Sequence, residues 1–206
     1  MNPDQALLQL LETLAERGYR FVTPTPATHK RVVARADRQV ARSVEDVLGW
    51  SLPFAPDLLD ADTMRLLQEA DILEPAGAGL LRARIRVSSL RDRLYLHSAY
   101  PTDAEDAVFF GPDSYRFADL IEAELGEGAC RIVDIGTGSG VGAIVAGQLR
   151  PGAEIVMTDI NGAALRLAAI NARAAGVSAQ PVLGSDLSSV PGPIDVALAN
   201  PPYIID

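Results

Sequence analysis

The chain has 206 residues, a formal net charge of −9 and a single cysteine, Cys130. This length allows one large domain or two small ones with a buried core. A single cysteine excludes an internal disulfide and a thiolate metal cluster, and we expect no metal site. The apolar runs are too short to span a membrane and the N-terminus lacks a secretory pattern, so a cytoplasmic protein without membrane partners is expected.

The charge is distributed unevenly along the chain. Residues 1–100 contain equal numbers of basic and acidic side chains, whereas residues 101–206 carry the whole negative excess. An acidic C-terminal half is a poor electrostatic partner for nucleic acid. The neutral half can still present a basic face.

The first part of the chain predicts several helices. Apolar residues at helical spacing predict a first helix from its cap Asp4 to about Arg17. Three further helices are expected over about 28–42, which is rich in arginine, over 44–49 after the cap Ser43, and from the cap Asp62 to about Ala70.

An alternating stretch then predicts a β-hairpin. Apolar residues alternate with arginines at Leu81, Arg82, Ala83, Arg84, Ile85, Arg86 and Val87. This pattern is typical of a half-buried strand, and a turn near 88–92 would lead to a partner strand at 93–98. The arginines form either a solvated sheet face or a docking face for RNA or an acidic protein. The sequence thus predicts a small, mainly helical α+β substrate-recognition domain at 1–104.

The second half predicts an α/β domain at 105–206, after an acidic, proline-containing linker. A helix capped by Asp113 or Ser114 would carry Phe117, Leu120, Ile121 and Leu125. After it, strands expected at 131–135, 154–158, 181–183 and 195–199 alternate with helices expected at 141–149 and 162–175. This order predicts a parallel sheet with right-handed crossovers, a Rossmann-like fold.

A glycine-rich turn follows the first of these strands. It reads Asp134-Ile135-Gly136-Thr137-Gly138-Ser139-Gly140. Alternate glycines let the backbone turn sharply and let a ligand approach the main chain. Asp159 and Ile160 end the next strand, and an acid there can accept both hydrogen bonds of a ribose diol. Dinucleotide-binding enzymes use Gly-x-Gly-x-x-Gly, and Val141 stands where their third glycine would be.

The last predicted strand runs into Asn200-Pro201-Pro202-Tyr203. Two prolines cannot continue the ladder, so the chain leaves the sheet at its carboxyl edge, where parallel sheets bind ligands. The Asn200 side-chain oxygen and the Pro201 carbonyl can accept hydrogen bonds from the two N–H groups of an amino or amide group. Tyr203 can stack on the plane of that group. These residues indicate chemistry at a planar nitrogen.

The order of these motifs resembles that of class I S-adenosylmethionine-dependent methyltransferases. The resemblance covers about 108–206 and is closest to the small-domain group that includes HemK-type protein-glutamine N5-methyltransferases. It implies S-adenosyl-L-methionine as cofactor, with Asp186 at the adenine amino group and Leu187 on the ring. The implied cofactor-binding residues are Asp134, Gly136, Thr137, Gly138, Gly140, Asp159, Ile160, Asp186, Leu187 and Asn200. The implied catalytic residues are Asn200, Pro201 and Tyr203.

The resemblance implies methyl transfer to a protein glutamine, with a release factor or a ribosomal protein as partner. HemK-type enzymes carry an Arg-Pro-Glu-Thr-Glu-like segment before the cofactor domain, where this chain has Gly111 for the arginine and Tyr115 for the last acid. Two alternatives therefore stay open. One is an RNA or DNA base N-methyltransferase acting on adenine N6 or guanine N2, and the other is a non-catalytic cofactor-binding module.

The end of the sequence also carries an expectation. Methyltransferases that resemble this chain continue their sheet with further strands after the Asn-Pro-Pro-Tyr strand. Without them, that strand would be an exposed apolar sheet edge. We therefore expect the sequence to be the N-terminal piece of a longer protein.

Overall fold

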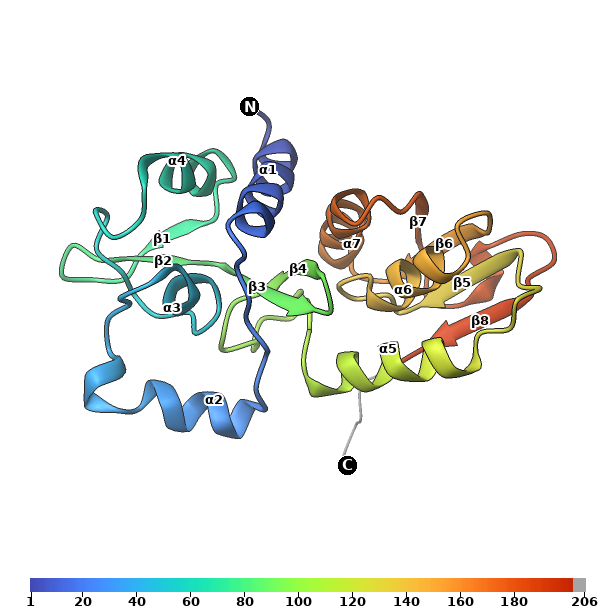
Figure 1. Ribbon diagram of the computed structural model, residues 1–206, viewed down its shortest axis with the longest axis horizontal. Helices are drawn as coiled ribbons and strands as arrows, with labels where there is room; N and C mark the ends of the chain where they lie inside the picture. The colour runs from blue at the N-terminus through green and yellow to red at the C-terminus, as the bar shows by residue number, and fades with distance from the viewer. Residues whose placement is uncertain (202–206) are drawn as a thin grey trace. The chain divides into compact units, whose positions relative to one another are not determined.

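A computed structural model describes residues 1–201, which belong to two compact units, 1–111 and 112–206 (Figure 1). The division lies after the predicted boundary at residue 104 because the stretch that follows the linker packs in the first unit. Val108 N donates to Ser98 Oγ at 2.8 Å, and the Phe110 ring lies 5.5 Å from the Tyr95 ring. No helix in the described range is long and apolar enough to cross a membrane.

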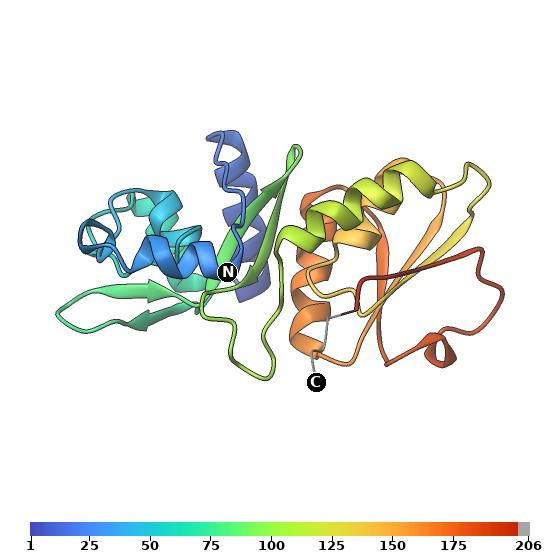
Figure 2. The same cartoon turned by 90° about the horizontal axis from the view of Figure 1, so that it is seen from below.

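The first unit combines helices with two antiparallel hairpins, where the sequence predicted helices and one hairpin. Its elements are α1 (Pro3–Glu16), α2 (Pro26–Val33), the 3-10 helix η1 (Ala36–Arg38), α3 (Val44–Leu48), α4 (Ala61–Glu69), β1 (Leu73–Pro75), β2 (Leu81–Ala83), β3 (Ile85–Leu90) and β4 (Arg93–Ser98). Figure 2 shows β1 and β2 as a long ribbon that extends from this unit.

Two of the three predicted N-caps are wrong by two residues. Asn2 rather than Asp4 caps α1, with its side chain accepting from a backbone N–H of the first turn. Asp60 rather than Asp62 caps α4 in the same way. In both helices the predicted acid lies in the first turn, where a carboxylate also interacts favourably with the helix dipole. Ser43 caps α3 as predicted.

The second helix is shorter than predicted. It ends at Val33 rather than near Arg42. Gln39 closes this end because its Nε2 donates to the carbonyl oxygens of Val33 at 3.0 Å and Arg35 at 2.9 Å. Carbonyls at a helix end lack an intrahelical partner, so a side-chain amide can terminate the helix here.

The arginines of the predicted hairpin do not share one solvated face. The chain pairs differently on the two sides of Arg84, so the predicted strand becomes β2 and β3, with β1 and β4 as their partners. Arg86 is only 4% exposed, and its Nε donates to Gly49 O at 2.9 Å. The edge of β3 that does not pair with β4 is covered by the segment around Phe21, whose carbonyl accepts a hydrogen bond from Ser89 N at 2.7 Å. The alternation of apolar residues and arginines in the sequence does not reveal that this segment packs there.

The second unit is a parallel α/β domain, which confirms the predicted Rossmann-like fold. Its described elements are α5 (Pro112–Glu124), β5 (Arg131–Ile135), α6 (Val141–Leu149), β6 (Glu154–Asp159), α7 (Gly162–Ala174), β7 (Ala179–Leu183), the 3-10 helix η2 (Leu187–Ser189) and β8 (Val196–Ala199). The strand order is β7-β6-β5-β8, and every neighbouring pair is parallel.

The sheet is covered differently on its two faces. The chain steps from β5 to β6 to β7 in one direction, so right-handed crossovers place α6 and α7 on the same face. Val190 and Ile194, from the long excursion between β7 and β8, pack against Val133 and Val156 in a separate apolar cluster. Helix α5 packs against α6, and its Leu120 is 57% exposed.

Candidate functional site

The carboxyl ends of all four strands meet at one edge of the sheet. Ile135 at the end of β5 lies opposite Thr158 of β6 and Ala199 of β8. Asp159 at the end of β6 lies opposite Leu183 of β7. The glycine turn, Ile160, the segment after β7 and Asn200 therefore all leave the sheet at this edge, where parallel sheets bind ligands.

The glycine turn depends on three residues with positive φ. The φ angles are +63° at Gly136, +54° at Gly138 and +84° at Gly140. A side chain is strained in this region, and a Cβ at Gly140 would also lie 3.1 Å from Ala168 Cβ of α7. Thr137 N donates to the Thr158 carbonyl at 2.9 Å. The turn is thus attached to both β6 and α7.

Asp134 lies beneath the turn rather than beside open space. Its side chain is buried, and its Oδ2 accepts from Thr137 Oγ1 at 2.6 Å and from Ala143 N at 2.9 Å. A Cβ at Gly142 would come within 2.7 Å of Asp134 Oδ1. Burial raises the pKa of Asp134 to about 6, although the two hydrogen bonds act in the opposite direction. The carboxyl group holds the start of α6 against the turn.

Asp159 links the second strand directly to the glycine turn. Its Oδ2 accepts from Gly138 N at 2.9 Å, and its Oδ1 accepts from Asn161 N at 2.9 Å. A carboxylate oxygen can accept a second hydrogen bond, so both oxygens keep acceptor capacity. The next residue, Ile160, leaves an apolar side chain 76% exposed at the same edge.

Asp186 is held by its own short helix. It caps η2, because its Oδ1 accepts from Ser188 N at 2.8 Å. Hydrogen bonds from Ser188 keep the pKa of this exposed carboxyl below its usual value. Leu187 follows with 39% of its surface exposed. Both residues lie on the excursion that follows β7.

Asn200 directly follows β8. Because Ala199 lies opposite Ile135, Asn200 leaves the sheet next to the residue that begins the glycine turn, Gly136. Asn200 is half-buried and Pro201 is exposed. Tyr203, the third predicted catalytic residue, lies outside the described residues.

Asn171 was not identified from the sequence. This α7 side chain is completely buried, and its Nδ2 donates to the carbonyl of Ser139 in the glycine turn at 2.9 Å. It lies on the buried face of the helix with Leu167 and Ala168. A polar residue at helical spacing among apolar ones was the available signal, because a buried amide requires partners.

Histidine and acidic residues do not gather into a metal-binding group in the described part of the chain. Within residues 1–201, no three His, Cys, Asp or Glu side chains are placed to hold an ion. The polar groups at the sheet edge are backbone amides, carboxylates and an amide side chain. Such groups recognise hydroxyl, amine and amide groups of an organic ligand.

The family model falls within the second unit, whereas one relative matches most of the chain. Residues 117–206 match the family model described as Methyltransferase small domain. A release factor glutamine methyltransferase of Cereibacter sphaeroides is 45% identical over 87 residues, which is 41% of this chain and 31% of that protein. A ribosomal protein L11 methyltransferase of Syntrophotalea carbinolica is 30% identical over 181 residues, 79% of this chain and 57% of that protein.

A third relative is an RNA methyltransferase. The ribosomal RNA small subunit methyltransferase C of Serratia proteamaculans is 29% identical over 73 residues, 35% of this chain and 21% of that protein. The chain spans about a third of the length of the release factor relative and little more than half that of the ribosomal protein relative.

Proposed function

Because residues 117–206 carry a methyltransferase small domain, we propose that this chain supplies the cofactor-binding part of an S-adenosylmethionine-dependent N-methyltransferase. One observation supports this most strongly. The glycine turn, bonded through Gly138 N to Asp159, lies at the same sheet edge as Asn200. A carboxylate and a side-chain amide thus lie on either side of one turn, as a ribose acceptor and an acceptor for a substrate nitrogen would have to.

The residues at this edge fit the parts of the cofactor. Asp159 has acceptor capacity for the two ribose hydroxyl groups. The exposed apolar side chains of Ile160 and Leu187 can pack on an adenine ring, with Asp186 as acceptor for its amino group. The turn from Gly136 to Gly140 leaves its backbone open to the methionine part. Asp134 would act indirectly, by supporting that turn.

Asn200 would contribute to the reaction by positioning the substrate nitrogen. When bound, S-adenosylmethionine supplies a methyl group on a positively charged sulfur. The Asn200 side-chain oxygen and the Pro201 carbonyl would accept hydrogen bonds from the two N–H groups of the substrate nitrogen. This arrangement would free the lone pair of that nitrogen from conjugation. Asn200 and Pro201 would thus hold the nitrogen toward the methyl carbon, the sulfur would leave with its electron pair as a neutral thioether, and water would take the proton that the nitrogen gives up. Orientation and exclusion of water lower the barrier without a strong base.

A protein glutamine amide is the substrate that we favour. Release factor glutamine methyltransferases recur among the relatives of this chain. The second candidate is an exocyclic amine of an RNA base, which the ribosomal RNA methyltransferase relative supports. Both are planar nitrogens, so the same acceptors at Asn200 and Pro201 would serve either.

Calorimetric titration with S-adenosylhomocysteine tests the cofactor site. We expect Asp159→Ala to weaken binding by about thirtyfold, because two charge-assisted hydrogen bonds to ribose are lost. Glu154→Ala is the matched control, since Glu154 is an exposed acid at the opposite end of the same strand. Equal affinities of the two variants, or binding of NADH by the unaltered chain, would contradict the proposal.

Transfer of a radiolabelled methyl group separates an enzyme from a passive binding module. We expect Asn200→Ala to lower turnover by about a hundredfold while affinity for S-adenosylhomocysteine stays within about threefold. A release factor and ribosomal RNA are offered in parallel as acceptors. Undiminished transfer by the variant would remove Asn200 from the mechanism, and labelled RNA alone would establish the second substrate.

A further inference from the structure

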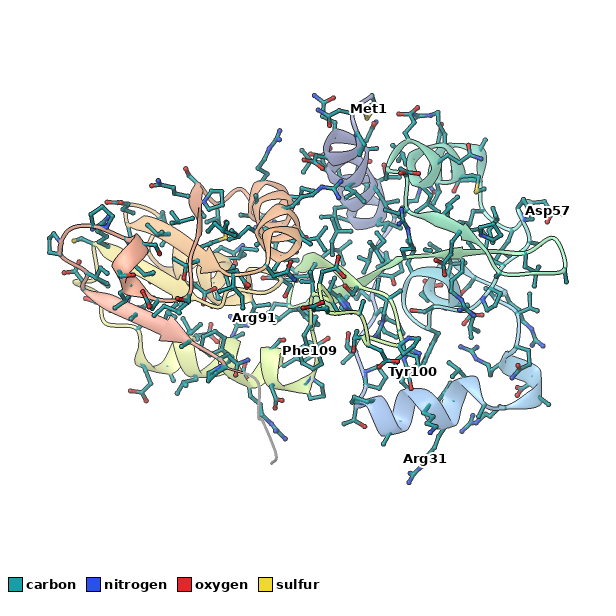
Figure 3. The ribbon with its side chains drawn as sticks, turned by 180° about the vertical axis from the view of Figure 1, so that it is seen from behind. Met1, Arg31, Asp57, Arg91, Tyr100 and Phe109 are labelled. Carbon is teal, nitrogen blue, oxygen red and sulfur yellow. The ribbon has the colours of Figure 1, made fainter. Side chains whose placement is uncertain are left out.

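Helix α2 lies on the surface of the first unit and carries basic side chains outward. Its only buried residue is His29, whose ring centroid lies 4.0 Å from that of Tyr100 and 5.3 Å from that of Trp50. Figure 3 shows Arg31 pointing from α2 away from the rest of this unit. Four exposed cations follow in the basic segment, which we define as residues 30–42: Lys30, Arg31, Arg35 and Arg42.

In the described part of the chain, these four cations lack an acidic partner, unlike three other exposed cations of the unit. Within residues 1–201, none of the four makes an ion pair. Elsewhere in the unit, ion pairs join Arg17 to Asp60, Arg20 to Asp92, and Arg65 to Glu69. In the segment itself only Arg38 is neutralised, by Asp46 at 2.6 Å. Asp37 is the single acid between residues 30 and 42, so the segment keeps a local positive excess.

The end of α2 does not need these cations for its own stability. Basic side chains in a last helical turn often serve the free carbonyl groups there. Here Gln39 Nε2 donates to the carbonyls of Val33 and Arg35 instead. The guanidinium groups of Arg31 and Arg35 are therefore available to an external anion.

The composition of the segment favours a phosphate partner over a protein. Protein interfaces have an apolar core. Among the exposed apolar residues of the segment, Ala34 and Ala36 are small, and only Val40 is larger, at 42% exposure. Contacts to a nucleic-acid backbone require little more than charge, and the arginine fork matches phosphate oxygens. We propose that the basic segment binds the phosphodiester backbone of a nucleic acid.

Salt-dependent binding of fluorescent oligonucleotides to the 206-residue chain tests this surface. The probes are single-stranded RNA, duplex RNA and duplex DNA, which together identify the source of the phosphates. Four phosphate contacts to a single strand predict an affinity loss of about fiftyfold between about 50 and 200 mM salt. Arg31→Gln/Arg35→Gln removes two contacts, so that loss should fall to about sevenfold.

The double variant Arg20→Gln/Arg65→Gln is the matched control. It removes the same net charge from the same unit, but from cations that are already paired. We expect it to keep the salt dependence of the unaltered chain, whereas Asp37→Asn should strengthen binding. Equal losses in the two double variants, or salt-independent binding, would overturn the proposal. Displacement of RNA by polyglutamate at equal charge concentration would indicate an acidic protein partner and overturn it as well.

Discussion

The two units each contain a set of polar side chains with a different arrangement. In the second unit, one set follows the ends of strands and keeps acceptor capacity at an open sheet edge, as Asp159 does. In the first unit, one set is buried and bonded internally: Thr23 Oγ1 lies 2.5 Å from Ser88 Oγ, which lies 2.8 Å from His97 Nε2. Such internal pairing stabilises a fold. Spare acceptor capacity at an edge is what a ligand requires.

The largest expected effect is a loss of folding stability at acidic pH, caused by His29. Burial, with a smaller contribution from the charge of Arg86, lowers the pKa of His29 to about 4. The unfolded side chain titrates near 6.5, so unfolding takes up a proton between these values. The contribution of His29 to stability is therefore complete above about pH 6.5 and is lost as the pH falls toward 4, at most about 3 kcal/mol.

Urea unfolding followed by tryptophan fluorescence measures this loss. Trp50 is the only tryptophan and lies against His29, so its emission reports on the first unit. The control is His29→Phe, which keeps an aromatic ring but cannot titrate. Between about pH 7 and pH 4.5, the unaltered chain should lose more stability than the variant. Parallel pH profiles would show that His29 is not held neutral by the fold.

The second effect concerns the glycine turn. Gly140→Ala should lower the stability of the second unit by about 2 kcal/mol, because φ is +84° and the new Cβ would press on Ala168. Circular dichroism during thermal unfolding measures the change. Gly152→Ala is the control, because Gly152 is exposed and nothing lies near its added Cβ. Similar melting temperatures for the two variants would mean that the turn relaxes without strain.

The smallest effect separates binding from folding at the sheet edge. Ile160 is 76% exposed, so Ile160→Ser should leave the unfolding free energy nearly unchanged. Its apolar surface would cover an adenine ring, so the Kd for S-adenosylhomocysteine should rise about threefold. Leu120→Ser is the control, an exposed leucine on α5. If both variants bind alike, Ile160 has no contact with the ligand.

The sequence predicts most of the second unit because each of its signals is local. Helix α6 was predicted with the observed bounds, since the glycine turn and the apolar run define both of its ends. In the first unit, the burial of Arg86 depends on a segment more than sixty residues earlier in the chain. Burial by a segment so distant in the chain does not change the periodicity of apolar residues in the sequence. The contact of Asn171 with Ser139 escaped for the same reason, because two separate elements create it.

The hydrogen bond between Gly138 and Asp159 has a consequence for the energetics of recognition. It fixes the open backbone of the turn while the chain folds. The conformational entropy of that loop is then lost before any ligand arrives, and association no longer has to order it. A preorganised turn of this kind should bind with little change in backbone structure, and free and bound forms should give similar amide hydrogen exchange there.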